Sequence, residues 1–339
     1  MKIALLGDFI SDNGPGNANK QIKEALMSSS KFKVKCSKAD NKIGRILETV
    51  NLVIWSDVLM ICSRSQLNYF AIKIATIMNR KILYLAHGCV SYEMKLNNPT
   101  ISHDEILRAV SYEKYVYDKA NRIVCVSKKA MEFMSLQFPE YADKFDYIYN
   151  IVNIDAITTC CNPSLEKEKK VLTVGGGLRR KNNYSVAKAM HLVGEKCGNV
   201  PFIVVGEKSL DGDKIEKFPE VQYIKHLPHE ELIELMGQCS LYVQNSTFET
   251  FGLAIIEALA AGADVLMSAN VGCIDLFNTI QDSDIIYDVN DIDEISKKIV
   301  WQLENGNNER LWNGMDKEMV STKFLLVRFD AILMKLLVA

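Results

Sequence analysis

Short apolar runs alternate with helical patterns along this 339-residue chain, and no other feature of the sequence constrains the fold as strongly. In the first half such runs occupy residues 2–6, 58–62, 82–86, 122–126 and 147–149, and helical patterns such as 21–28, 67–78 and 106–119 lie between them. Polar or turn residues bound each run, as is typical of a parallel strand buried on both faces. The alternation predicts an α/β fold with parallel sheets and right-handed crossovers.

The alternation occurs twice, which predicts a second domain. The pattern loosens after residue 153, a charged run follows at residues 166–170, and new apolar runs occupy residues 171–174, 202–205, 222–224, 240–244, 264–268 and 284–287. We therefore expect two doubly wound, Rossmann-like domains, at residues 1–153 and 154–321, with ligands at the carboxyl ends of the strands. The last residues, about 322–339, are rich in apolar side chains and are expected to form a helix.

Composition argues against several classes of protein. Hydrophobic residues make up 48% and charged residues 24% of the chain, as is typical of a globular protein, and the net charge of −2 gives no reason to expect nucleic acid. No apolar stretch reaches the roughly 18 residues of a transmembrane helix, and residues 1–7 turn polar too early for a signal peptide. The nine cysteines lack C-x-x-C spacing, so we expect reduced thiols, no metal and a cytoplasmic location.

Two acidic residues eight positions apart, Glu249 and Glu257, flank a turn that opens a predicted helix. Free backbone N–H groups and the helix dipole at such a turn favour a diphosphate. The two carboxylates would repel a bare phosphate but can accept hydrogen bonds from sugar hydroxyls. The segment therefore suggests a ligand with phosphate between two hydroxyl-bearing rings, which is the layout of a nucleotide sugar. The alternative is an ordinary amphipathic helix that ends at Gly262.

A glycine-rich, basic segment follows the first predicted strand of the second domain, where residues 175–181 read G-G-G-L-R-R-K. Glycines allow a backbone to approach a ligand, and the cations of Arg179, Arg180 and Lys181 suit a phosphate. The alternative is a flexible turn that ends in a solvated basic cluster.

Two features of the first domain are candidates for ligand contacts. Residues 12–20 include Gly14, Gly16 and Asn17 and are expected to form a loop between the first strand and its helix, although such turns often contain Gly and Asn without a functional reason. His87 follows the run at 82–86, so it is expected at the carboxyl end of a strand, where ligands bind in such sheets. A lone histidine is otherwise more often structural than catalytic.

The segment around the two acids resembles the E-x7-E signature of retaining glycosyltransferases of family 4, the group 1 glycosyl transferases with two Rossmann-like domains (GT-B). That signature commonly reads S-x-x-E-x-F-G-x-x-x-x-E-A-x-A-x-G, and the chain departs from it at Thr250, where glycine is usual. The matching positions are Ser246, Glu249, Phe251, Gly252, Glu257, Ala258, Ala260 and Gly262. The resemblance implies two facing domains with a cleft between them, and a last helix that packs back on the first domain. An oligomer contact is the alternative for that helix.

The resemblance also implies how a donor nucleotide sugar binds, mainly to residues 171–275. Glu257 would hold ribose hydroxyls, and Glu249 would contact the transferred sugar and stabilise positive charge at its anomeric carbon. Lys181 matches the lysine of the family's V-G-R-L-x-x-x-K loop, whereas Gly176 stands in place of its arginine. Arg180 or Arg179 is therefore expected to supply the missing charge.

Further contacts follow from the same resemblance. Gly206 corresponds to a turn beside the base, residues 12–20 to a glycine loop over the diphosphate, and His87 to a histidine near the donor sugar. The diphosphate is also expected to contact the turn after Glu249, at Thr250, Phe251, Gly252 and Leu253. No metal or cofactor is expected, and retention is expected to proceed by attack on the same face of the sugar.

The resemblance thus implies a retaining, metal-independent hexosyltransferase that uses a nucleotide sugar, UDP by family frequency, and a saccharide or lipid-linked acceptor that binds mainly to the first domain. Cell-surface polysaccharide or glycolipid synthesis is the expected context. The lysine-rich residues 20–45 are either a solvated face or a peripheral contact with the inner membrane surface. Two other functions stay open: a non-catalytic, sugar-nucleotide-binding subunit of another transferase, and a nucleotide-sugar epimerase of the same fold.

Overall fold

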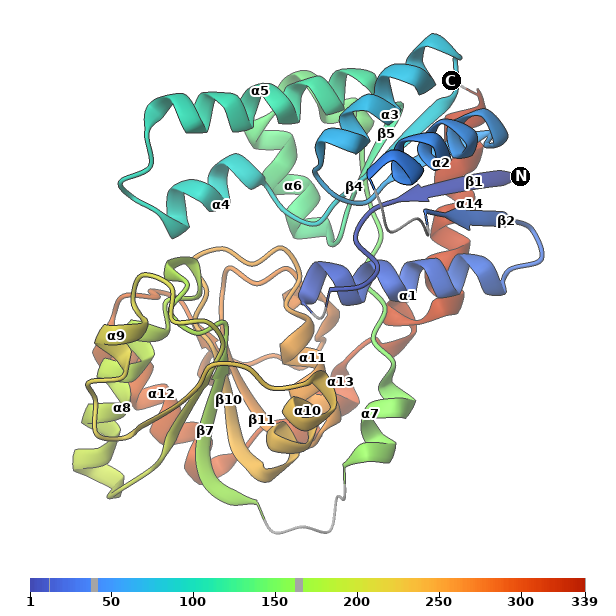
Figure 1. The fold of residues 1–339 in the computed structure, drawn as a ribbon. Coiled ribbons are helices and arrows are strands. Elements are labelled where there is room, and N and C mark those ends of the chain that lie inside the picture. Colours follow the sequence, from blue (N-terminus) through green and yellow to red (C-terminus); the bar gives the residue numbers. More distant parts are fainter. Residues whose placement is uncertain (12, 38–41, 162–166, 339) are drawn as a thin grey trace. The chain divides into compact units, whose positions relative to one another are not determined.

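The computed structural model describes residues 1–11, 13–37, 42–161 and 167–338, which form two compact units (Figure 1). Unit 1 comprises Met1–Tyr92, Ser102–Ile151 and Glu318–Ala339, and unit 2 comprises Glu93–Ile101 and Val152–Lys317. Of the charged run at residues 166–170 that was predicted as a join, residue 166 lies outside the described residues, whereas Glu168–Lys170 form the start of a strand of unit 2. None of the described helices is long and apolar enough to cross a membrane.

Unit 1 contains a six-stranded, fully parallel sheet in the order β2-β1-β3-β4-β5-β6. The strands are β1 (Lys2–Leu6), β2 (Lys33–Cys36), β3 (Val58–Ile61), β4 (Lys81–Ala86), β5 (Arg122–Cys125) and β6 (Phe145–Tyr147). The helices are α1 (Gly14–Ser28), α2 (Lys42–Trp55), α3 (Gln66–Ile77), α5 (His103–Lys119), α6 (Lys128–Gln137) and α14 (Thr322–Val338). Helix α4 (Val90–Asn97) begins in unit 1 and continues, from Glu93, in unit 2. The residues of the central strand β3 are all buried, which explains why its sequence is a continuous apolar run.

Unit 2 repeats the plan with the strand order β12-β11-β10-β7-β8-β9. Its strands are β7 (Glu168–Val174), β8 (Phe202–Val205), β9 (Val221–Ile224), β10 (Cys239–Gln244), β11 (Asp264–Ser268) and β12 (Ile285–Ile286). Its helices are α7 (Ile154–Cys160), α8 (Asn183–Cys197), α9 (Gly212–Ile215), α10 (His229–Gln238), α11 (Leu253–Ala260), α12 (Ile292–Asn305) and α13 (Asn308–Gly314). The predicted α/β fold with two Rossmann-like domains is confirmed.

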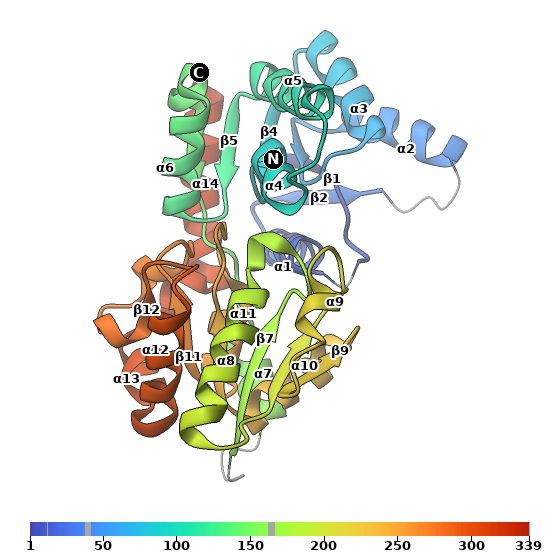
Figure 2. The same cartoon turned by 90° about the vertical axis from the view of Figure 1, so that its left-hand side faces the viewer.

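The helices of unit 2 form two groups around its sheet. Buried side chains of α8 and α12 pack against those of β7, β8, β10 and β11, whereas α7, α10 and α11 contact one another (Figure 2). Because parallel strands carry helices on their faces, both faces of the sheet are covered and the loops at the carboxyl ends of the strands remain for ligands.

The prediction that residues 14–17 form a loop is wrong, because α1 already begins at Gly14. Asn13 caps the helix by accepting a hydrogen bond from the backbone N–H of Gly16, and Pro15 lies in the first turn, where its fixed φ fits a helix. A side chain at Gly16 would lie 2.3 Å from the carbonyl oxygen of Ser11, so this glycine is required by close packing.

The last helix, α14, belongs to unit 1 and contacts α1. Its buried face is apolar, and Phe329 meets Phe32 edge-on with ring centroids 5.9 Å apart. Asp146 accepts hydrogen bonds from Arg328 at 2.6 Å and from Lys335 at 2.9 Å. Apolar burial and these two ion pairs therefore hold the end of the chain to unit 1.

Candidate functional site

The site in unit 2 is built where two neighbouring parallel strands end. β7 and β10 are paired, so the glycine-rich segment after β7 and the turn after β10 emerge at the same edge of the sheet. The backbone N–H of Thr247 donates to the carbonyl of Arg180 at 2.8 Å and fastens the two segments together. This arrangement explains why Lys181 and Glu249, 68 residues apart in the sequence, are in contact.

Glu249 is held as a carboxylate in a mostly buried position, with 12% of its side chain exposed. Its Oε2 atom accepts hydrogen bonds from Lys181 Nζ and, at 3.0 Å, from Gln244 Nε2. Burial alone would raise the pKa of Glu249, but the charges of Lys181 and Arg180 and the N–H of Phe251 outweigh burial and hold it below its usual value. Burial lowers the pKa of Lys181 despite the attraction of Glu249. The pair is therefore a fixed charge pair at the strand ends.

The two candidate arginines differ in their burial and in their partners. Arg180 is largely buried, with 19% of its side chain exposed, and its Nη1 lies 3.5 Å from Glu249 Oε2. Arg179 is 43% exposed and pairs with Asp211 at 3.6 Å. Arg180, together with Lys181, thus supplies the positive charge beside Glu249.

Gly176 cannot carry the arginine that the resembling family has at this position. Its φ of +53° is in the left-handed region, and a side chain would lie 2.2 Å from the carbonyl oxygen of Glu207. Gly206 has a φ of +133° and packs equally closely, since its Cβ would lie 2.7 Å from the backbone nitrogen of Gly176. These two glycines let the turns after β7 and β8 pack against each other.

The turn between Glu249 and α11 exposes a helix N-terminus. Gly252 adopts a φ of +101° and precedes Leu253, the first residue of the helix, and no side chain caps the first turn. Phe251 anchors the turn because its carbonyl accepts a hydrogen bond from the N–H of Cys273 at 2.8 Å. Thr250 lies partly exposed in the same turn. The first N–H groups of α11 are thus available to an anion.

Glu257 has a partner that the sequence analysis did not identify. It lies in α11, and its Oε1 is 3.0 Å from Nε2 of His229, the first residue of α10. Residues 228–232 read P-H-E-E-L, which is typical of a helix start, but nothing in this sequence indicates a contact with Glu257. The histidine fixes the orientation of this carboxylate.

Gln244 and Tyr242 are further residues that the sequence analysis missed. Both are buried in β10, and the hydroxyl of Tyr242 lies 2.9 Å from Oε1 of Gln244. With Oε1 engaged as acceptor, the Gln244 amide group directs Nε2 at Glu249. A polar residue at the end of the apolar run L-Y-V-Q was the available signal.

The unit 1 candidates form a separate group. Nε2 of His87 lies 2.7 Å from Oδ1 of Asn19, whose amide nitrogen donates to the carbonyls of Asp8 at 2.9 Å and Cys62 at 3.3 Å. Because Asn19 Oδ1 is the acceptor, His87 carries its proton on Nε2. Asn17 lies in the first turns of α1, and its side chain accepts from Lys20 at 3.4 Å. Neither Asn19 nor its role was predicted.

His87 is expected to remain neutral throughout the physiological range. Burial lowers its pKa from 6.5 to about 4, so the unfolded chain binds more protons between these values and stability is lost as the pH falls from about 6.5 towards 4. NMR of the imidazole C–H signals should show no titration of His87 between pH 5.5 and 8. A midpoint near 6.5 for His87 would contradict the buried, neutral state.

The second half of the chain matches a known family of proteins. Residues 162–316 match the family model described as "Glycosyl transferases group 1". Over 158 residues the chain is 29% identical to the "O-antigen chain mannosyltransferase B" of Escherichia coli, which covers 43% of this chain and 41% of that protein. The chain thus spans about two fifths of the length of this curated relative.

Solved structures match the whole chain. HepE (Alr3699) from Anabaena, solved in complex with UDP and glucose, has a TM-score of 0.69 and 16% identity, with 100% of both chains covered. Sucrose-phosphate synthase from Thermosynechococcus elongatus has a TM-score of 0.70 and 16% identity, with 99% of both chains covered. At this identity the likeness shows the fold alone, which is the two-domain GT-B fold.

Proposed function

Because residues 162–316 match the family model of the group 1 glycosyl transferases, we propose that this protein is a glycosyltransferase that takes a sugar from a nucleotide sugar. The observation that carries the proposal is the arrangement of Glu249, Lys181 and Arg180 beside the uncapped start of α11. Two cations and free N–H groups suit a diphosphate, and a fixed carboxylate next to them suits the hydroxyls of a sugar.

Each part of this site has a role in the proposed reaction. Lys181, Arg180 and the N–H groups that open α11 stabilise the negative charge that develops on the departing diphosphate, which is the main electrostatic contribution available. Glu249 holds the hydroxyls of the transferred sugar, and its negative charge favours the positive charge that develops at the anomeric carbon. Glu257, fixed by His229, accepts hydrogen bonds from the ribose.

We further propose the finer features that the family 4 resemblance implies. These are retention of anomeric configuration by same-face attack, a UDP-sugar donor and catalysis without a metal. The complex of HepE with UDP and glucose supports the choice of UDP, and the name of the E. coli relative supports a saccharide acceptor of a cell-surface polymer.

A peripheral contact with the inner membrane surface is part of the same proposal. The outer side of α2 supports it, because this helix exposes Ile43, Ile46, Leu47 and Ile54, and Arg45 lies among them. Flotation of the protein with anionic but not with neutral vesicles is the expected result, and no flotation with either would remove the membrane from the proposal.

Thermal stabilisation by nucleotides is the first test of the proposed function. A ligand that binds only the folded protein raises its melting temperature, so UDP and one UDP-sugar should do so, with EDTA present as well as with Mg²⁺. GDP-, ADP- and other sugars serve as comparisons for the base. No shift with any of them would remove the transferase proposal and favour a non-catalytic subunit. A sugar product of inverted configuration would contradict retention.

Replacement of Gln244 by leucine should lower kcat for sugar transfer about 10-fold and leave the KM for the donor nearly unchanged. Leucine cannot donate to Glu249, and it leaves the buried hydroxyl of Tyr242 without its partner, while Lys181 and Arg180 still bind the diphosphate. Steady-state kinetics with varied donor measure both constants. Combining Gln244→Leu with Tyr242→Phe should restore stability but not kcat. Equal loss in kcat and in donor affinity would instead indicate general damage to the site.

A further inference from the structure

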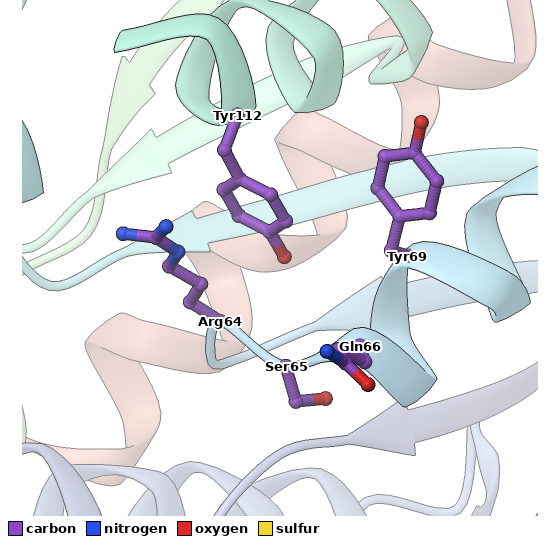
Figure 3. A pocket seen from close by; sticks show the side chains of 5 residues that line it. All are labelled: Arg64, Ser65, Gln66, Tyr69 and Tyr112. Carbon is purple, nitrogen blue, oxygen red and sulfur yellow. The ribbon is translucent and has the colours of Figure 1, made fainter. Parts of the chain in front are cut away.

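Unit 1 contains a hollow that none of the roles above uses. It has a volume of about 630 Å³ and is lined by Arg64, Ser65, Gln66, Tyr69 and Tyr112 (Figure 3). Three of these residues lie between the end of β3 and the first turn of α3, and Ser65 caps that helix by accepting from the N–H of Asn68. The hollow therefore opens at the carboxyl end of a central parallel strand, where α/β sheets bind ligands, and its volume is that of a small-molecule site.

Aromatic rings form one side of the hollow. Tyr69 from α3 and Tyr112 from α5 lie with ring centroids 6.3 Å apart and planes inclined by 29°. Tyr115 stacks on Tyr69 at 4.2 Å, also at 29°, and so limits the movement of that ring. Figure 3 shows the Tyr112 and Tyr69 side chains approaching the hollow from two different helices. A cation also stands over each ring, Lys73 over Tyr69 and Arg64 over Tyr112, both 4.7 Å from the ring centre. The fixed rings offer their remaining apolar surface to a ligand at little cost in conformational entropy, with positive charge beside it.

Two polar side chains of the hollow, those of Arg64 and Gln66, have no hydrogen-bond partner among the described residues. Arg64 is its only charged lining residue, is exposed, and stands 4.7 Å from the centre of the Tyr112 ring. Within the part of the chain that the structure describes, Arg64 makes no hydrogen bond or ion pair, and neither does the exposed side chain of Gln66. A planar guanidinium with free donors is the group that best binds a carboxylate or phosphate.

We propose that this hollow binds an anionic saccharide, meaning a sugar ring that carries a carboxylate or a phosphate, as part of the acceptor. This inference rests on the proposed transferase function. The C–H face of the sugar packs against Tyr69 and Tyr112, the anionic group pairs with Arg64, and Gln66 bonds a hydroxyl. The charge of Arg64 selects an anionic ligand, because the lining residues include no acid. Glu113, an acid that does interact with Arg64, is buried and already accepts hydrogen bonds from the backbone of Val90 and Ser91.

The experiment measures binding directly, without turnover. Ligand-observed NMR titrations of the full chain use four probes: glucuronic acid, glucose 1-phosphate, methyl glucoside and inorganic phosphate. Both charged sugars should bind at least about 10-fold more tightly than methyl glucoside and than phosphate alone, because only they use both the rings and Arg64. Tighter binding of glucuronic acid would identify a uronic-acid acceptor, and tighter binding of glucose 1-phosphate a sugar phosphate.

Variants assign the binding to the hollow. Arg64→Gln should weaken the charged sugars about 10-fold and leave methyl glucoside unchanged, whereas Tyr69→Leu should weaken all three sugars. Arg108→Gln is the matched control, since Arg108 is an exposed arginine of α5 that does not line the hollow. Gln66→Ala, at an exposed position, provides a second lining variant that should fold normally.

Two results would overturn the proposal: charged sugars that bind Arg64→Gln as tightly as the unaltered protein, or phosphate that binds as tightly as glucose 1-phosphate. UDP stabilisation is measured on the same variants. Because the hollow and the nucleotide site lie in different units, normal UDP stabilisation without saccharide binding would reject the hollow alone. If the unaltered protein shows neither UDP stabilisation nor saccharide binding, the transferase function itself is rejected.

Discussion

Replacing Glu249 with glutamine should lower kcat for sugar transfer by about 10³-fold, the scale seen when one preorganised electrostatic group is removed from an active site. The substitution keeps the shape of the side chain but removes its negative charge. It therefore removes the stabilisation of positive charge at the anomeric carbon and leaves Lys181 without its carboxylate partner, while Arg180 keeps its ion pair with Glu93 at 3.5 Å. We expect donor binding to survive, because both cations remain in place for the diphosphate.

The measurement compares the initial rate of sugar transfer with UDP-induced thermal stabilisation on the same preparations. Glu304→Gln is the control, since it changes an exposed acid of α12 that touches no part of the site. Glu249→Gln with an unchanged kcat would remove the central role proposed for this residue. Loss of UDP stabilisation together with kcat would show that the variant disrupts the site rather than the reaction.

Lys181→Met tests whether Glu249 acts alone or with its partner. Groups that work as a unit give non-additive losses, because the first substitution already removes most of what the pair contributes. Lys181 and Glu249 are in direct contact. We therefore expect the kcat of the double variant Glu249→Gln, Lys181→Met to be about as low as that of the slower single variant. If the fold decreases in kcat of the two single variants multiply in the double variant, Lys181 and Glu249 act independently.

The fold was predictable because its signal is local. A buried parallel strand such as β3 must be apolar at each position, so the run itself reveals the strand. β2 was missed for the opposite reason: it lies at the edge of the sheet, and its sequence K-V-K-C alternates between exposed and partly buried residues. The start of α1 was misplaced because glycines suggested a loop, whereas Asn13 and Pro15 favour a helix start there.

The site was predictable only where a motif carries it. Glu249 and Lys181 stand in recognisable segments, and the strand order brings those segments together. Gln244, His229 and Asn19 are not themselves motif residues, and their importance lies in contacts with residues up to 68 positions away. A contact of this kind depends on the packing of side chains in three dimensions, which periodicity and spacing do not determine.

The structure also gives a physical reason for one departure from the family motif. Gly176 replaces an arginine at a point where the left-handed backbone and the neighbouring turn leave no room for a side chain. Arg180 reaches Glu249 from four residues further along. A positive charge beside Glu249 thus comes from another backbone position, and the loop keeps its close packing against the turn at Gly206.

Replacing Asp284 with asparagine should lower the free energy of unfolding of unit 2 by about 3–5 kcal/mol, as expected when one partner of a buried ion pair is removed. Asp284 is 0% exposed and forms two parallel hydrogen bonds with Arg310, at 2.8 and 2.9 Å. It also accepts from Asn307 at 2.8 Å and from the backbone of Gln281 at 2.7 Å. Asparagine would leave the guanidinium of Arg310 without its counter-charge.

Urea unfolding, followed by tryptophan fluorescence in a Trp55→Phe background, measures this loss. Only Trp301 and Trp312, both in unit 2, then report the transition. Asp282→Asn is the control two residues away, because its side chain is 82% exposed and 3.7 Å from Lys298, so about 0.5 kcal/mol or less is expected. Equal effects of the two substitutions would contradict the assigned role of the buried pair.

The pH dependence of the same comparison provides an independent test of the charge. Burial alone would raise the pKa of Asp284, but the hydrogen bonds from Arg310, Asn307 and Gln281 outweigh it and hold the pKa below the ordinary 3.8. The folded protein therefore binds fewer protons than the unfolded chain around that pH, so the stabilisation is complete above it and is lost as the pH falls through the lower folded value. The difference between unaltered protein and Asp284→Asn should be constant from about pH 7 to 5 and shrink below about pH 4. A difference that persists undiminished in acid would mean that packing, rather than the carboxylate charge, accounts for the effect.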